Sequence, residues 1–283
     1  MSLQLDQDRM KERELKGFLT EIKSGEKNWS DIDQRLVVKS MMKYIGSIDS
    51  ELRDQLIFTS FYKLIIERNE IEPELLIDLL ETCLDDFLFK GIGENGTDTV
   101  FTRSFTSLLI ALILGRDTED NFLSQSMVYR VKDELIHYIN SEKDLRGYVP
   151  EKGWAHSVAH VADTFDELAK NPKISHELYL EMLIPLWNKI FVSESVYVHH
   201  EDERLLIPII EMLNNGLETK EVENLLRKLP VELKAQKEQL EYEKYLLLEF
   251  NSKTFLKSFY MKLNKNPKLA ALQKSIEQCL TSI

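Results

Sequence analysis

The sequence has 283 residues, of which 30 % are charged and 43 % hydrophobic, and its formal net charge is −12. These proportions are typical of a globular protein and exclude an extended disordered chain. The strong negative charge argues against general nucleic-acid binding, because phosphate neutralisation needs a basic surface.

The cysteines and the apolar segments indicate in which cellular compartment the protein is expected. Cys83 and Cys279 lie far apart in apolar helical patterns, which favours buried free thiols over a disulfide. The N-terminal residues contain no unbroken apolar run of signal-peptide length. The longest apolar run, Leu108 to Leu114, is far shorter than the ~20 residues needed to cross a bilayer. We therefore expect a cytoplasmic protein that is not in a membrane.

Amphipathic helices are predicted along nearly the whole chain. Apolar residues recur at three- and four-residue intervals, as they do on the buried face of a helix, and Ser, Pro and Gly mark many of the ends. No stretch alternates apolar and polar residues between turn signals, so almost no strand is expected. The predicted helices cover approximately residues 5–23, 30–46, 51–69, 73–89, 100–114, 121–140, 153–170, 175–191, 201–214, 218–228, 231–250 and 253–282.

The clearest loop is residues 91–99, GIGENGTDT, which contains three glycines. Its glycines lack the spacing and the preceding strand of a nucleotide-binding loop, so that function is disfavoured. The helix that follows, VFTRSFTSLLIALIL, is apolar on almost every side, which predicts a central position in the fold.

Polar groups recur at the starts of four predicted helices. Arg53 with Asp54, Arg103 with Ser104, His156, and Arg204 are separated by 50, 53 and 48 residues. Helical pairs in HEAT and armadillo repeats occupy roughly 40–47 residues. The spacing predicts an all-α fold of one domain, residues 1–283, with about a dozen helices in stacked antiparallel pairs. A HEAT- or armadillo-like right-handed solenoid is favoured over an irregular helical array.

The most unusual stretch is DLRGYVPEKGWAHSVAHVAD, residues 144–163. His156, His160 and Asp163 stand at positions i, i+4 and i+7, so they share a helix face that is turned away from the apolar stripe. This face fits a metal site if Glu201, Asp202 or His200 supplies a further ligand. A general acid/base or ligand-binding histidine, or a solvated face without function, is favoured over the metal site. The predicted metal ligands are His156, His160, Asp163 and Asp202.

The arginines point towards anion binding. Arg103 interrupts an apolar helix, where an unpaired charge would cost several kcal/mol, so it needs a carboxylate partner or a ligand. Near helix N-termini, whose free N–H groups also favour anions, Arg53, Arg103 and Arg204 would form an anion-binding groove. The equally weighted alternative is a buried network of arginines and carboxylates that holds successive repeats in register.

The loop before residue 156 contains side chains suited to covering a pocket. Pro150 and two glycines shape its turns, and Tyr148 and Trp154 offer flat surfaces. Trp154 is equally suited to packing against the start of its own helix. Ser104 lacks the surrounding motif of a serine hydrolase nucleophile, so that activity is disfavoured.

Four segments resemble the uncharacterised bacterial family catalogued as domain of unknown function 2785. The third segment is long and unusual, and residues 216–283 carry less of the resemblance. The resemblance implies an all-helical, soluble protein with no established activity. The resembling segments are ELRDQLIF at 51–58, VFTRSFTSLLIALIL at 100–114, DLRGYVPEKGWAHSVAHVADTFDELAKNP at 144–172 and EDERLLIPI at 201–209.

Three functions are consistent with these patterns. We expect a polar groove that binds a small anionic ligand or an anionic segment of a partner protein. The alternatives are a metal-assisted hydrolase that uses His156, His160 and Asp163, and a scaffold without catalytic activity, and no cofactor is indicated. The scaffold is favoured if His156, His160, Arg103 and Arg204 share no accessible cavity. The candidate ligand-binding residues are Arg53, Arg103, Ser104, Arg146, Tyr148, Trp154, His156, His160, Glu201, Asp202 and Arg204.

Overall fold

The computed structural model describes residues 10–264 and 266–283. It is 73 % helical with twelve α-helices, and within the described residues the one sheet is a hairpin of two short strands. The predictions of an all-α fold and of almost no strand are therefore confirmed. The HEAT or armadillo likeness, the right-handed solenoid and the single-domain organisation stay predictions.

The helices follow the predicted order along the chain. Segments of π-helix, Glu51–Phe58 and Lys63–Glu67, extend α3 on both sides, and Cys83–Phe87 extends α4. The α-helices are α1 Glu12–Ser24, α2 Gln34–Lys43, α3 Thr59–Tyr62, α4 Pro73–Thr82, α5 Thr99–Asp120, α6 Gln125–Ser141, α7 Ser157–Lys170, α8 Tyr179–Asn188, α9 Glu201–Asn214, α10 Thr219–Gln239, α11 Tyr242–Leu263 and α12 Ala270–Ser282; the strands are β1 Tyr148–Val149 and β2 Gly153–Trp154.

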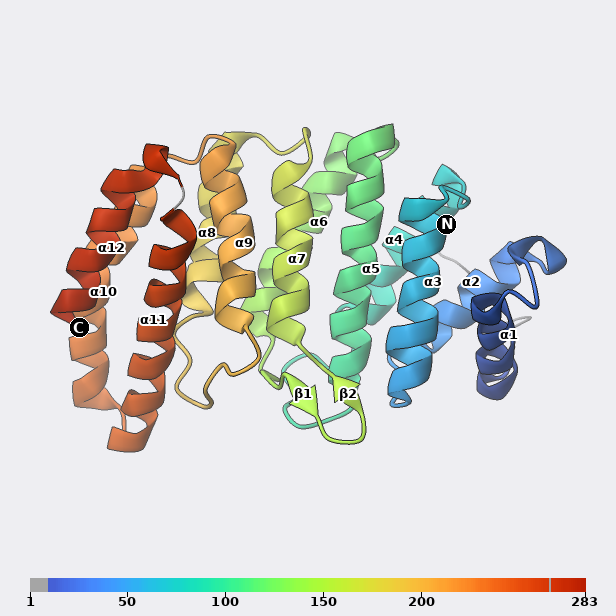
Figure 1. The fold of residues 1–283 in the computed structure, drawn as a ribbon, viewed down its shortest axis with the longest axis horizontal. Coiled ribbons are helices and arrows are strands. Elements are labelled where there is room, and N and C mark those ends of the chain that lie inside the picture. The colour runs from blue at the N-terminus through green and yellow to red at the C-terminus, as the bar shows by residue number, and fades with distance from the viewer. Residues whose placement is uncertain (1–9, 265) are drawn as a thin grey trace.

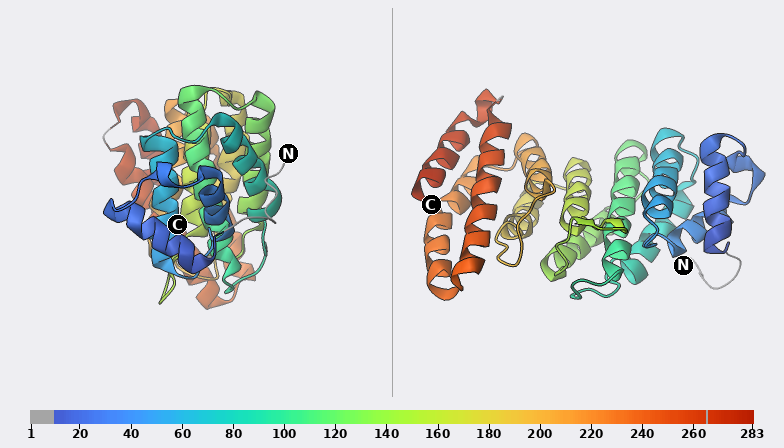
Figure 2. Two further views of the ribbon diagram at one scale, coloured as in Figure 1. Left: turned by 90° about the vertical axis from the view of Figure 1, so that its right-hand side faces the viewer. Right: turned by 60° about the horizontal axis from the view of Figure 1, so that its bottom comes forward.

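The odd-numbered helices from α3 to α11 lie side by side in one layer (Figure 1). Helices α4, α6, α8 and α10 lie behind them, where α6 contacts α8, and α12 packs against both α10 and α11 at the C-terminal end. Two further views show how this arrangement extends along one axis from the N-terminal to the C-terminal helices (Figure 2). Because alternate helices share a layer, residues about 50 positions apart become neighbours in space.

The helix α5 is central to the core, as predicted. It contacts α7 on one side and the α3 segment on the other, and it also packs against α4. By length and composition α5 is the one described helix that could cross a membrane, but 78 % of its apolar window is buried inside the protein. Its apolar residues on all sides are explained by neighbours in both layers.

Several predicted helix boundaries are wrong. The predicted end at residue 114 lies inside α5, and the predicted breaks at residues 229–230 and 251–252 lie inside α10 and α11. Pro230 is therefore accommodated within α10. Leu226, Leu229 and Leu233 remain buried on both sides of the proline, so packing of this stripe outweighs the lost backbone hydrogen bond. The predicted helix at 153–170 begins only at Ser157, because β2 occupies residues 153 and 154.

Candidate functional site

The segments that carry Arg53, Arg103, His156 and Arg204 begin at one edge of the layer, at the bottom of Figure 1. The β1–β2 hairpin lies at this edge, and its register pairs Tyr148 with Trp154. The placement agrees with the one-edge arrangement expected from the spacing of about 50 residues.

Arg53 is fully buried and binds the hairpin to the α3 segment. Its guanidinium donates hydrogen bonds to the carbonyl oxygens of Ser47, at 2.7 Å, and Lys152, at 2.8 Å. It lies 4.3 Å from the ring centroid of Phe101, and its Nε is 2.8 Å from Oδ1 of Asp54. The charge is thus satisfied by the protein itself.

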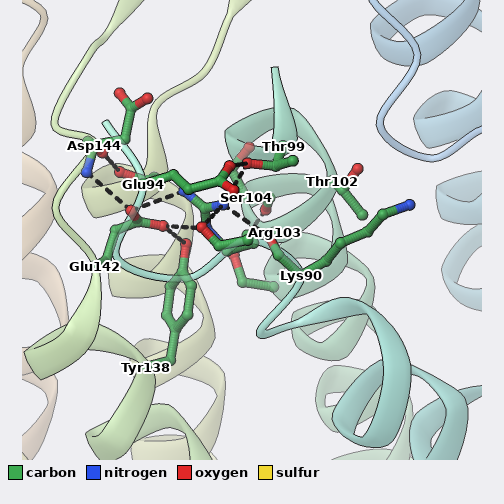
Figure 3. Close-up of polar contacts among 12 residues, drawn as sticks. Lys90, Glu94, Thr99, Thr102, Arg103, Ser104, Tyr138, Glu142 and Asp144 are labelled. Carbon is green, nitrogen blue, oxygen red and sulfur yellow. Dashed lines mark hydrogen bonds and ion pairs between the residues drawn. The ribbon is translucent and has the colours of Figure 1, made fainter. Parts of the chain in front are cut away.

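Arg103 is fully buried in a second satisfied network (Figure 3). Its Nε and Nη2 donate to the two carboxylate oxygens of Glu142 at 2.7 and 3.0 Å, and Nη1 donates to Lys90 O, Gly91 O and Thr99 Oγ1. Burial lowers the pKa of Arg103, but the hydrogen bond and the charge of Glu142 outweigh this and raise it overall. The bidentate pair joins α5 to the end of α6.

Arg146 and Arg204 are paired as well. Arg146 donates to both carboxylate oxygens of buried Asp144, and Arg204 does the same to Asp163. Each of the four predicted arginines therefore has a carboxylate partner within the chain. Because Arg53 and Arg103 have no exposed surface, the four helix starts do not share an accessible anion-binding cavity.

Two histidines and one glutamate converge beside the hairpin. The ligand atoms of His156, His199 and Glu201 all lie within 4.8 Å of one another. Nε2 of His156 is 3.5 Å from Oε1 of Glu201, and Nδ1 of His199 is 3.9 Å from the same oxygen. The carboxylate is 3 % exposed, and Nε2 of His156 is buried without a hydrogen-bond partner in the described structure. Three separate segments thus place three potential metal ligands together.

The backbone around these residues is shaped for close approach. His156 precedes α7 in the left-handed conformation, with φ 46° and ψ 37°, which is unfavourable for a residue with a side chain. A Cβ atom at Gly147 would lie 2.3 Å from Nδ1 of His199 and 2.8 Å from Oε1 of Glu201. Only glycine at position 147 leaves room for this arrangement.

Aromatic rings cover the cluster. Trp154 stacks on the His156 ring, with centroids 4.4 Å apart, and meets His199 edge-on at 5.2 Å. Tyr148 lies edge-on to Trp154 at 5.1 Å. The stacked indole of Trp154 restricts movement of the His156 imidazole. Trp154 is 38 % exposed, so part of its surface also faces solvent.

Burial acts to raise the pKa of the Glu201 carboxyl. The nearby His156 imidazole and the backbone hydrogen bonds oppose burial, and the net pKa is lowered. One of these bonds runs from the backbone N–H of His199 to Oε2 at 2.9 Å. Glu201 is therefore an ionised carboxylate, the form that binds a metal ion.

A cavity of about 240 Å³ adjoins the cluster. His199 and Glu201 line one side, and Tyr148 and Arg146 line another. Lys143 also borders the space, so positive and negative groups both reach it. The cavity gives a small molecule access to two of the three converging side chains.

His160 lies beneath His156 in the core. Its ring meets Phe105 edge-on at 5.1 Å and His156 at 5.7 Å, and its Nδ1 is buried without a hydrogen-bond partner in the described structure. Burial, followed by the charges of His156, Arg204 and Arg53, lowers the pKa of His160 well below 6.5. The imidazole is therefore neutral at neutral pH.

Acidification should destabilise the protein through His160. Below its ordinary pKa of 6.5 the unfolded chain binds a proton that the folded protein does not, so stability rises with pH in that window. As the pH falls below 6.5, we expect a loss of up to about 1.4 kcal/mol per pH unit from this group. Urea unfolding at several pH values should show a shallower slope for His160→Gln and an unchanged slope for His200→Gln, whose side chain is 80 % exposed. Equal slopes in all three proteins would contradict this assignment.

The proposed metal ligands do not all converge. Asp163 is held by Arg204, and Asp202 accepts a hydrogen bond from Ser258 at 2.5 Å, so both carboxylates have other partners. Ser104 donates to the Phe101 carbonyl at 3.3 Å. The structure thus brings together His156, His199 and Glu201, whereas Asp163 and Asp202 contact other side chains and His160 lies in the core.

His199 is the residue that sequence reasoning missed. The HHEDER segment contains two adjacent histidines, and the candidate ligands predicted from it are His200, Glu201 and Asp202. His200 precedes α9 with φ 66° and points to solvent, with Nδ1 3.4 Å from Oε1 of Glu203. Adjacent side chains diverge at such a turn, so the backbone conformation decides which histidine faces Glu201.

A family model described as "Protein of unknown function (DUF2785)" matches residues 88–261. The matched range contains His156, His199 and Glu201, and it extends through α5 to most of α11. No curated protein and no solved structure matches the chain.

Proposed function

The chain belongs to the DUF2785 family of proteins of unknown function, and we propose that it is a zinc-dependent protein with His156, His199 and Glu201 as metal ligands. The observation that carries this proposal is the approach of three ligand atoms, from three segments, to within 4.8 Å of one another. Two imidazoles and a carboxylate form a ligand set that zinc prefers.

The separations suit a zinc ion. Ligand atoms at ordinary zinc distances lie about 3.4 Å apart in a tetrahedral site. The separation between His156 Nε2 and Glu201 Oε1 is 3.5 Å, and that between His199 Nδ1 and the same oxygen is 3.9 Å. Small side-chain movements would therefore complete the site. The ion would also give the buried Nε2 of His156 the partner that it lacks.

The ligand set is that of a catalytic centre rather than a structural one. Structural zinc has four protein ligands, whereas catalytic zinc has three and keeps one position for water or substrate. Zinc lowers the pKa of its bound water to about 7, which makes hydroxide available at neutral pH. With a cavity of about 240 Å³ beside His199 and Glu201, hydrolysis of a small molecule is the reaction class that this centre supports best.

Zinc binding is the direct test. The full-length protein, stripped with a chelator, should bind one zinc ion per chain, and the bound form should unfold at a higher temperature because the metal binds only the folded state. Cobalt(II) in its place should give the visible absorption of a tetrahedral site. The His200→Ala variant is the control, because that neighbouring imidazole points to solvent. Failure to bind one equivalent of either metal would reject the proposal.

A structural role is the second candidate, and the four paired arginines favour it. In this alternative, His156 and Glu201 belong to the network that holds the hairpin against α7 and α9. The same titration separates the two: a scaffold binds no metal, yet His156→Ala still lowers its stability. The predicted anionic ligand remains compatible with the zinc proposal, because a bound dication would attract a carboxylate or phosphate.

A further inference from the structure

A second cavity, of about 490 Å³, lies on the face of the odd-numbered helices. It is lined by the α3 segment, α5, α7 and α9, and it shares no lining residue with the cavity beside His199. Its apolar lining includes Phe58, Tyr62, Leu112 and Ile207. Tyr62 is 40 % exposed, so part of its ring is free to contact a ligand.

Acidic side chains also line this groove: Asp163, Asp166 and Glu167 of α7 and Glu119 of α5. Two cations offset these carboxylates: Arg204 pairs with Asp163, and Lys170 bridges Asp166 and Glu167 at 2.6 and 2.9 Å. The groove therefore retains a negative charge, to which nearby Glu211 on α9 adds.

Asp166 is an incompletely satisfied carboxylate at the edge of the groove. The residue is 8 % exposed, and its Oδ1 atom is buried without a hydrogen-bond partner in the described structure. Burial raises the pKa of Asp166, Lys170 opposes this, and Glu167 and Glu211 raise it further. A buried carboxylate beside other carboxylates is stabilised by an additional positive charge.

Gly115 leaves room for one of these acidic side chains. A Cβ atom at this position of α5 would lie 3.1 Å from Oε2 of Glu167. The glycine thus lets the Glu167 carboxylate lie against α5. An acidic group and an apolar surface are in this way brought into one groove.

We propose that this groove binds an organic cation, an amine or guanidinium on an apolar stem, with the stem against Tyr62 and Leu112 and the cationic head at Asp166 and Glu167. The Tyr62 ring adds a large apolar surface for the stem. The same chemistry occurs in a free alkyl or aryl amine and in a lysine or arginine side chain of a partner. This inference is independent of the zinc centre.

Calorimetric titration with 2-phenylethylamine tests the proposal on the full-length protein. We expect saturable binding to wild type and at least about tenfold weaker binding of the neutral analogue 2-phenylethanol, which corresponds to the loss of one favourable charge interaction. Asp166→Asn should weaken amine binding by a similar factor. Asp133→Asn should not, because that carboxylate is 70 % exposed on α6 and lies outside the groove.

Glu167→Gln serves as the second variant in case Asp166→Asn does not fold, and the melting temperature of each variant verifies its fold. Equal affinity for amine and alcohol, or unchanged amine binding in both folded variants, would overturn the proposal. A helical peptide of leucine and lysine distinguishes the two sources of the cation, a free amine and a side chain of a partner protein. Displacement of the amine by the peptide assigns the cation to a partner's side chain, and retention of the amine assigns it to a free small molecule.

Discussion

Replacing Arg103 by alanine should lower the free energy of unfolding by about 3–5 kcal/mol, the range seen when one member of a buried ion pair is removed. The substitution leaves the carboxylate of Glu142, which is 1 % exposed, without its bidentate partner. It also removes the donor to the carbonyl oxygens of Lys90 and Gly91. Urea denaturation followed by circular dichroism measures this change.

The matched control is the exposed pair between Arg130 and Asp85, whose side chains are 39 and 48 % exposed. Arg130→Ala should cost less than about 1 kcal/mol, because water screens and replaces the interaction. The double variant Arg103→Met with Glu142→Gln should recover much of the lost stability, since the glutamine oxygen can accept from the backbone N–H of Asp144 while its NH2 group donates to the Tyr138 hydroxyl oxygen. If Arg103→Ala lowers the free energy of unfolding no more than Arg130→Ala does, the buried ion pair of Arg103 does not stabilise the fold.

Replacing Glu201 by glutamine should weaken zinc binding by about 100-fold or more. Loss of a residue that only supports a ligand already costs 10- to 100-fold, and Glu201 would bind the ion directly. Its Oε1 atom is the one that approaches both imidazoles, at 3.5 and 3.9 Å. Glutamine keeps the size of the side chain and an oxygen that can accept the His199 N–H, which places its NH2 group at the Oε1 position, so the effect reports on loss of the ligand oxygen and its charge. Competition with a colorimetric chelator measures the affinity.

Asp202→Asn is the control for this experiment. Asp202 is the next residue along the chain and is also buried, but its carboxylate contacts Ser258 on α11. Its substitution should leave zinc affinity within about threefold of wild type, because it is not a ligand. Similar losses in the two variants would mean that the effect comes from a disturbed α9 rather than from the metal ligand.

The helices and their order were predictable because they depend on local properties of the chain. The periodicity of apolar residues predicts which side of each helix is buried, and capping residues indicate many of the ends. The spacing of Arg53, Arg103, His156 and Arg204 also indicated helix starts along one edge, which is where the structure places them. The break predicted at residues 229–230 is wrong. Buried leucines on both sides of Pro230 continue α10 through the proline.

The sequence by itself determined the all-α class, the central position of α5 and the polar character of the edge that carries His156. Only the tertiary structure decided the partners of those polar groups. Arg103 meets Glu142 and Arg204 meets Asp163, pairs separated by 39 and 41 residues, and many other carboxylates were equally available in the sequence. The left-handed backbone at His200 turns His199, rather than its neighbour, towards Glu201. Long-range packing and single backbone torsions decide such contacts, and neither is encoded in a periodic pattern of residue types.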